Sequence, residues 1–211
     1  MVHLKHQDVP RPRTLTGITS LPSHHHRAQQ RVNDCLQSKS PHPLDKHPSV
    51  TLYCTDAICR DSTSIRHPLS PLSSDPPYTS ILALDCAYHF RTRQTFLQQS
   101  FARLAPGGYL ALADITVSSD YLQSTRKYAN YLLAYAFAHP TANLISPATY
   151  AQQLIDIGFE DVQVQDITDD VFPGFRAFLR TQGGSWRVFE MVLGTWVNLG
   201  RRFVLVSGRR P

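Results

Sequence analysis

The chain has 211 residues, enough for one domain with a full hydrophobic core, and a formal net charge of +5. Its lysines and arginines are scattered rather than gathered into a basic stripe, which argues against nucleic-acid binding. No apolar run approaches the roughly 20 residues of a membrane span, and the four cysteines form no C-x-x-C pair. Unpaired cysteines suit a reducing compartment, so we expect a cytoplasmic protein.

The first third of the chain predicts two strands separated by a helix. A short β-rich segment covers residues 13–19, and apolar positions at helical spacing predict a helix over residues 24–35. A polar, proline-rich loop over residues 37–48 leads to a second strand at residues 50–54. Residues 60–78 are rich in Ser, Pro and Asp, and we predict another loop there.

A tighter pattern follows over residues 80–115. The run SILALD (80–85) is almost continuously apolar, as expected of a strand buried on both faces of a parallel sheet. Residues 92–104 have the spacing of an amphipathic helix, which Pro-Gly-Gly at 106–108 is expected to end. A second buried strand, YLALADI (109–115), completes a strand–helix–strand unit, whose crossover is right-handed as a rule.

The last part of the chain continues to alternate helices with strands. Helices are predicted over residues 119–138 and 147–157, and a strand over residues 159–166. A mostly helical stretch at 175–199 precedes a last strand at 203–207. This alternation predicts an α/β fold with a Rossmann-like, mainly parallel sheet and helices on both faces.

We find no internal repeat and no clear linker, so we predict one domain over residues 1–211. Within it, residues 14–118 would form the first strand–helix units. Residues 119–158 would form a helical cap after the fifth strand of the fold, and residues 159–211 the C-terminal strands and helix.

Residues 78–115 carry several motifs in a fixed order. A buried strand ends in Asp85, the pair His89-Phe90 follows, and a helix leads to Leu-Ala-Pro-Gly-Gly at 104–108. This stretch of about 40 residues resembles the region between the fourth and fifth strands of class I S-adenosylmethionine-dependent methyltransferases that act on small molecules. Because the features match in order, the resemblance is more specific than a lone Pro-Gly-Gly.

Other segments fall into the same register. Residues 15–20 (LTGITS) resemble the family's second strand, and tocopherol- and sterol-type members of the methyltransferase type 11 group read Gly-Ile-Thr there. Residues 50–57 resemble the third strand and its Asp-Ala, and residues 150–159 resemble the helix before the sixth strand. The resemblance spans residues 14–207 and implies S-adenosylmethionine as the cofactor.

One family element is missing from this register. In the family, a first strand and a Gly-x-Gly-x-Gly loop precede the second strand, and glycine lets that backbone approach the cofactor at positive φ. The only glycine before Val50 is Gly17. We therefore interpret the fold as N-terminally truncated, with a truncated gene model, a genuine short product and a degenerate paralogue as the three explanations.

The resemblance implies five cofactor-binding residues: Thr19, Ser20, Asp56, Ala57 and Asp85. Asp56 would accept a hydrogen bond from the adenine amino group, and Thr19 and Ser20 would bind the ribose hydroxyls. Capping or turn formation is the structural alternative for the polar members of this set, because Asp, Ser and Thr commonly form turns.

His89 is the candidate catalytic residue. An imidazole titrates near neutral pH and can take a proton from a substrate hydroxyl, while the alternative is a satisfied structural histidine. Tyr88, Phe90, Tyr128 and Tyr131 are candidate substrate-binding residues that would wall an apolar pocket. Tyrosines at helical spacing are also typical of ordinary packing, which remains the alternative.

The sequence thus predicts an S-adenosylmethionine-dependent methyltransferase that acts on a small, apolar metabolite. The run His24-His25-His26 predicts no metal site, because successive helical positions diverge by about 100° and cannot converge on one ion. The rival hypothesis is a non-catalytic methyltransferase-like module that has lost cofactor binding. A dehydrogenase half is disfavoured because no Gly-x-Gly-x-x-Gly opens a strand–helix unit.

Overall fold

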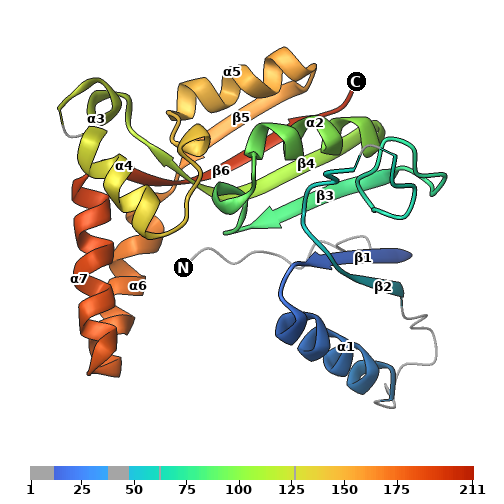
Figure 1. Cartoon of the computed structure of the whole chain (residues 1–211), viewed down its shortest axis with the longest axis horizontal. Helices are drawn as coiled ribbons and strands as arrows, with labels where there is room; N and C mark the ends of the chain where they lie inside the picture. The colour runs from blue at the N-terminus through green and yellow to red at the C-terminus, as the bar shows by residue number, and fades with distance from the viewer. Residues whose placement is uncertain (1–11, 38–47, 62, 126) are drawn as a thin grey trace, which may run out of the picture. The chain divides into compact units, whose positions relative to one another are not determined.

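The computed structural model describes residues 12–37, 48–61, 63–125 and 127–211 (Figure 1). The chain divides into two compact units, Met1–Ala57 and Ile58–Pro211, and each is described by itself. The single domain expected over residues 1–211 stays a prediction. No helix within the described ranges is long and apolar enough to cross a membrane.

The first unit is a strand–helix–strand arrangement, as predicted. Strand β1 (Thr14–Thr19) leads into helix α1 (Pro22–Gln37), and strand β2 (Ser49–Cys54) returns parallel to β1. The helix begins at Pro22, two residues before the predicted start, because the fixed φ of proline suits the first helical position. The parallel register pairs Thr19 with Cys54, so the two strands end side by side.

The second unit is built on a four-stranded sheet in the order β3-β4-β6-β5. Strand β3 (Tyr78–Leu84) runs parallel to β4 (Leu104–Val117), whereas β6 (Arg201–Arg209) is antiparallel both to β4 and to β5 (Glu160–Asp166). Three of the four strands therefore point the same way. This confirms the predicted α/β fold with a mainly parallel sheet.

Helices α2 (Arg93–Arg103) and α5 (Pro147–Ile157) lie together over one face of this sheet (Figure 1). Their inward-facing side chains, such as Leu97 and Leu154, are fully buried, and so is Leu110 of β4. Burial of this kind contributes about 25 cal/mol for each Å² of apolar surface removed from water. The core therefore rigidly supports the carboxyl ends of β3 and β4.

The remaining helices lie near the end of the sheet at which β3, β4 and β5 finish. Helices α6 and α7 form an antiparallel pair whose contact buries Phe172, Leu179 and Leu193, and both helices contact β6 (Figure 1). The full set is η1 (Ala87–His89), α3 (Ser119–Gln123), α4 (Lys127–Ala136), η2 (Thr141–Asn143), α6 (Thr168–Gln182) and α7 (Ser185–Asn198).

Two predicted helices differ from those observed. The helix expected over residues 119–138 is split into α3 and α4, because Ser124 has an extended backbone. Helix α6 begins at Thr168 rather than near residue 175, and the Asp166 carboxylate accepts hydrogen bonds from the N–H and the hydroxyl of Thr168 at this start. Pro173 lies inside this helix, where it removes one backbone hydrogen bond without ending the helix.

The boundaries around the Pro-Gly-Gly segment also differ. Strand β4 begins at Leu104, five residues before the predicted Tyr109. Gly107 adopts a φ of +76° and donates its N–H to the Arg210 carbonyl at 2.8 Å, so the segment pairs with the end of the chain. Helix α5 ends at Gly158, with a φ of +110°, as predicted for a left-handed glycine at a helix terminus.

Candidate functional site

A cavity of about 490 Å³ lies in the second unit, at the edge where β3 and β4 end. Ligands of open α/β sheets bind at the carboxyl ends of the strands, so its position is that of an active site. One part of the lining is polar and consists of Asp85, Tyr88, His89 and His139. The rest is apolar and comes mainly from α6, α7 and β6.

The apolar wall is largely aromatic. Phe172 of α6 packs edge-to-face on Phe203 of β6 with centroids 5.9 Å apart, and Phe175 packs on Phe189 of α7 at 6.4 Å. Trp196 of α7 completes this side and is only 9% exposed. Such walls exclude water and favour a ligand with an apolar body.

Asp85 and Tyr88 form a hydrogen-bonded pair at the polar end. Asp85 follows β3 directly, has a φ of +53° and donates its N–H to the Ala113 carbonyl at 2.8 Å. The Tyr88 hydroxyl donates to the Asp85 carboxylate. Burial raises the pKa of both side chains, and the neighbouring carboxylate raises the pKa of Tyr88 further. Tyr88 is therefore a neutral hydrogen-bond donor at neutral pH.

His89 has the arrangement of a proton acceptor. The neighbouring carbonyl of Ala138 and the charge of Asp85 both favour the protonated ring. Burial lowers the pKa of His89, and this outweighs the opposing effects of the Ala138 carbonyl and the Asp85 charge. The imidazole is thus neutral at neutral pH and able to take a proton.

Asn143 holds the backbone on both sides of His89. Its Nδ2 donates to the carbonyls of Tyr88 at 3.0 Å and Phe90 at 2.7 Å. Its Oδ1 accepts from the backbone N–H of Arg93 at 3.0 Å. No sequence pattern singles out Asn143, because its role depends on a turn more than fifty residues away along the chain.

A buried ion pair anchors this arrangement to the sheet. The Arg93 guanidinium lies 2.6 Å from the Asp114 carboxylate, and the two side chains are 1% and 0% exposed. Asp114 also accepts from the Tyr150 hydroxyl at 2.9 Å and from the Ile115 N–H at 2.9 Å. Asp114, near the end of β4, therefore has a structural role in the core and is not part of the cavity lining.

His139 is the polar lining residue that sequence reasoning missed. It is 5% exposed, and its ring centroid lies 4.6 Å from that of His89 and 4.8 Å from that of Tyr88. Burial lowers the pKa of His139 to about 4, and the neighbouring His89 and Arg201 lower it too. The site therefore contains two neutral imidazoles in contact. A histidine-proline pair after a tyrosine-rich helix is the only signal the sequence offers.

The first unit holds four of the predicted cofactor residues at one strand edge. Thr19 is the last residue of β1 and Ser20 follows it, while Asp56 and Ala57 come shortly after β2. The backbone N–H of Thr55 donates to the Thr19 carbonyl at 3.0 Å, so the two strand ends are joined. Two hydroxyls, which donate and accept, and a carboxylate, which accepts, fit the hydroxyls and the amino group of a nucleoside.

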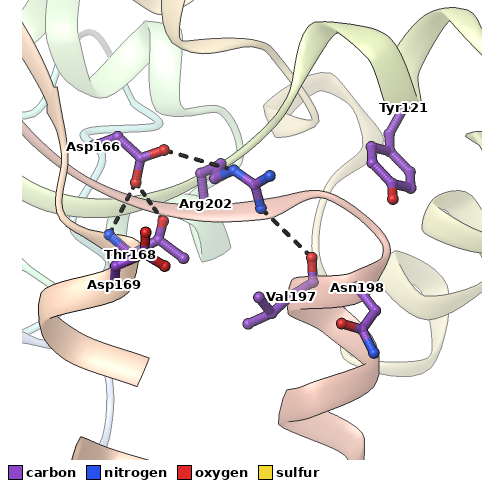
Figure 2. A pocket seen from close by; sticks show the side chains of 7 residues that line it. All are labelled: Tyr121, Asp166, Thr168, Asp169, Val197, Asn198 and Arg202. Atoms are coloured by element: carbon purple, nitrogen blue, oxygen red, sulfur yellow. Dashed lines mark hydrogen bonds and ion pairs between the residues drawn. The ribbon is translucent and has the colours of Figure 1, made fainter. Parts of the chain in front are cut away.

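A second cavity, of about 530 Å³, is mainly polar (Figure 2). Asp166 accepts from the backbone and side chain of Thr168 and lies 3.6 Å from the Arg202 guanidinium (Figure 2). Arg202 in turn donates to the Val197 carbonyl at 3.5 Å. These groups satisfy one another, so the cavity of about 490 Å³ with the largely aromatic wall, called the aromatic cavity below, is the stronger candidate site.

Comparison with known proteins identifies the family. The family described as "Methyltransferase domain" matches residues 14–164. The chain belongs to this methyltransferase family. An erythromycin 3''-O-methyltransferase from Saccharopolyspora erythraea is 31% identical over 100 residues, which are 44% of this chain and 32% of that protein. This methyltransferase chain thus matches about a third of the length of that curated relative.

Solved structures share the fold at low identity. A geranyl diphosphate C-methyltransferase from Streptomyces coelicolor A3(2) superposes with a TM-score of 0.66 at 14% identity, over 95% of this chain and 63% of that one. The [4+2]-cyclase SpnF superposes with a TM-score of 0.60 at 14% identity, over 94% and 66%. Because this fold also occurs in a cyclase, the fold alone does not determine the reaction, which depends on the residues of the site.

The predicted substrate residues are dispersed in the structure. Tyr88 lines the aromatic cavity, whereas the Phe90 ring packs on Phe96 at 5.0 Å. Tyr128 and Tyr131 of α4 are 68% and 42% exposed and lie outside the lining of this cavity. The roles of Phe90, Tyr128 and Tyr131 in substrate binding stay predictions. The aromatic side chains that wall the cavity come instead from α6 and α7.

Proposed function

We propose that the protein is an S-adenosylmethionine-dependent methyltransferase that acts on a hydroxyl of a small, apolar metabolite. The observation that carries this proposal is the aromatic cavity, whose apolar walls end at the neutral imidazole of His89. Membership of the methyltransferase family supports the reaction class. An O-methyltransferase among the relatives supports oxygen as the acceptor atom.

The proposed chemistry divides between cofactor and protein. S-Adenosylmethionine, when bound, supplies a methyl group on a sulfonium, and the protein aligns the acceptor and excludes water. His89 takes the proton of the acceptor hydroxyl, which makes the oxygen a better nucleophile. The aromatic wall of α6 and α7 holds the apolar body of the acceptor.

Five residues are proposed to hold the cofactor. Thr19 and Ser20 would bond the ribose hydroxyls, and Asp56, followed by Ala57, would accept from the adenine amino group. Asp85 would offer a carboxylate to the ammonium group of the methionine part. We further propose that the protein acts in the cytoplasm, without a nucleic-acid partner.

Cofactor binding tests the proposal directly. Titration calorimetry with S-adenosylmethionine should show micromolar-range binding to the full chain, and Asp56→Ala should weaken it about tenfold by removing one hydrogen bond to the ligand. The control is Asp34→Ala, an exposed carboxylate on α1 whose loss should change nothing. Absence of binding to folded wild-type protein would refute the enzyme proposal and favour the non-catalytic module.

A further inference from the structure

His139 carries an unpaired polar atom in the wall of the aromatic cavity. Its Nδ1 is buried and has no hydrogen-bond partner among the residues that the structure describes. Trp196, in contact with His139 at a centroid distance of 5.3 Å, leaves its buried Nε1 without a partner in the same part of the chain. Buried polar groups are nearly always hydrogen-bonded, so this wall lacks a polar partner that a ligand can supply.

The position of His139 relates this unpaired atom to the proposed base. The rings of His139 and His89 lie edge-to-face with centroids 4.6 Å apart, at an interplanar angle of 78°. Because the two rings are in contact, a polar group that binds one imidazole lies next to the other. Phe137 packs edge-to-face on Trp196 at 4.8 Å, and Trp196 contacts His139, so aromatic rings lie beside the imidazole pair.

The charge state of His89 and His139 favours a neutral ligand group over an anionic one at this end of the cavity. Both imidazoles are neutral at neutral pH, because burial lowers the pKa of each. A neutral imidazole offers one donor and one acceptor, and a hydroxyl offers the same complement. A carboxylate would find no cation among these lining residues and would be repelled by Asp85.

We propose that the cavity binds its ligand through a single neutral hydroxyl held between His89 and His139, with Nδ1 of His139 as the second hydrogen-bonding partner. This inference rests on the proposed methyltransferase function and specifies its acceptor as an apolar alcohol or phenol. His139 holds the oxygen while His89 takes its proton. The alternative is that His139 only packs against Trp196, in which case an apolar ring of similar size would replace it without consequence.

Binding of a matched pair of probes separates these two roles. The affinities of 2-naphthol and naphthalene are measured by NMR titration for the wild type, His139→Phe and His139→Gln. The wild type should bind 2-naphthol about tenfold more tightly than naphthalene, as expected for hydrogen bonding of one hydroxyl. In His139→Phe the preference should fall to about twofold or threefold while naphthalene affinity is retained. His139→Gln should restore part of it.

A control variant and a second readout complete the test. Phe137→Leu, which changes the apolar lining only, should weaken both probes equally. In the wild type, 2-naphthol and not naphthalene should shift the ¹⁵N resonance of His139 Nδ1. An unchanged naphthol preference in His139→Phe, or no naphthol preference in the wild type, overturns the inference. The measurement needs no cofactor, so a failure of S-adenosylmethionine binding refutes the methyltransferase proposal without deciding this one.

Discussion

Titration of His139 gives the protein a stability that depends on pH. The pKa of His139 is lowered from 6.5 to about 4 in the folded chain. Above pH 6.5 the imidazole is neutral in both the folded and the unfolded state. As the pH falls toward 4, the unfolded chain binds a proton that the folded chain does not. The free energy of unfolding therefore decreases across this range and the contribution is lost below it.

The size of the effect follows from the shift. Each pKa unit corresponds to about 1.4 kcal/mol, so a fall from 6.5 to about 4 gives roughly 3 kcal/mol in all, of which roughly 2 kcal/mol is lost by pH 5. The buried position of His139, at 5% exposed, makes solvent screening small. Asp85, Tyr88, His89 and Arg201 are the other titratable groups near the ring.

Urea denaturation at several pH values between 4 and 7 measures this contribution. The variant His139→Phe keeps the aromatic packing but cannot titrate, so its free energy of unfolding should fall by about 3 kcal/mol less than that of the wild type over this range. Carboxylates distant from His139 titrate in both proteins and cancel in the difference. Equal pH dependence in the two proteins would show that His139 is not held neutral by burial, and the argument would fail.

Three further predictions concern the base, the buried ion pair and the apolar wall. His89→Gln should lower methyl transfer to an accepted alcohol or phenol by about 10²-fold or more, and His26→Gln, at an exposed position, is the control. The acid limb of the wild-type pH–rate profile should lie below pH 6.5, because the neutral base is the active form and its pKa is lowered. A wild-type limb above pH 6.5 would contradict this. Asp114→Ala should lower the free energy of unfolding by about 3–5 kcal/mol, because it leaves the Arg93 charge buried and unpaired; a loss under 1 kcal/mol would argue against a buried pair. Phe175→Ala should weaken naphthalene binding but cost little stability, since the ring is 40% exposed, and a large drop in melting temperature would place it in the core instead.

The sequence predicted best the segment with the strongest local pattern, although the expected burial of β3 on both faces was wrong, since Leu82 and Leu84 are 67% and 70% exposed. The apolar runs of β3 and β4 and the helix α2 between them are where they were expected. The antiparallel position of β6, between β4 and β5, could not be read from its apolar run, because strand order is set by packing of distant segments. The same holds for the break at Ser124, which depends on backbone geometry rather than composition.

Part of the candidate site was predictable for a simple reason. Asp85, Tyr88 and His89 directly follow a buried strand, and a residue in that position lies at the ligand-binding edge of the sheet. His139 follows a helix and a tight turn, and its proximity to His89 arises only when α4 packs against the end of β4, where Ala134 and Val117 share a buried cluster. Sequence spacing contains no information on a contact of this kind.

The residues proposed to bind and deprotonate the acceptor hydroxyl and the residues proposed to hold its apolar body come from different parts of the fold. The polar end is fixed through Asn143 to the buried pair of Arg93 and Asp114, and a change there would disturb the core as well as the base. The apolar wall comes from α6 and α7, where Phe175 and Phe189 are each 40% exposed and contribute little to the core. Substitutions in these two helices can therefore change the size of the accepted body while His89 and His139 still hold one hydroxyl. We therefore expect substitutions in α6 and α7 to change which acceptors fit. Substitutions of His89 or His139 should change the preference for acceptors that carry a hydroxyl.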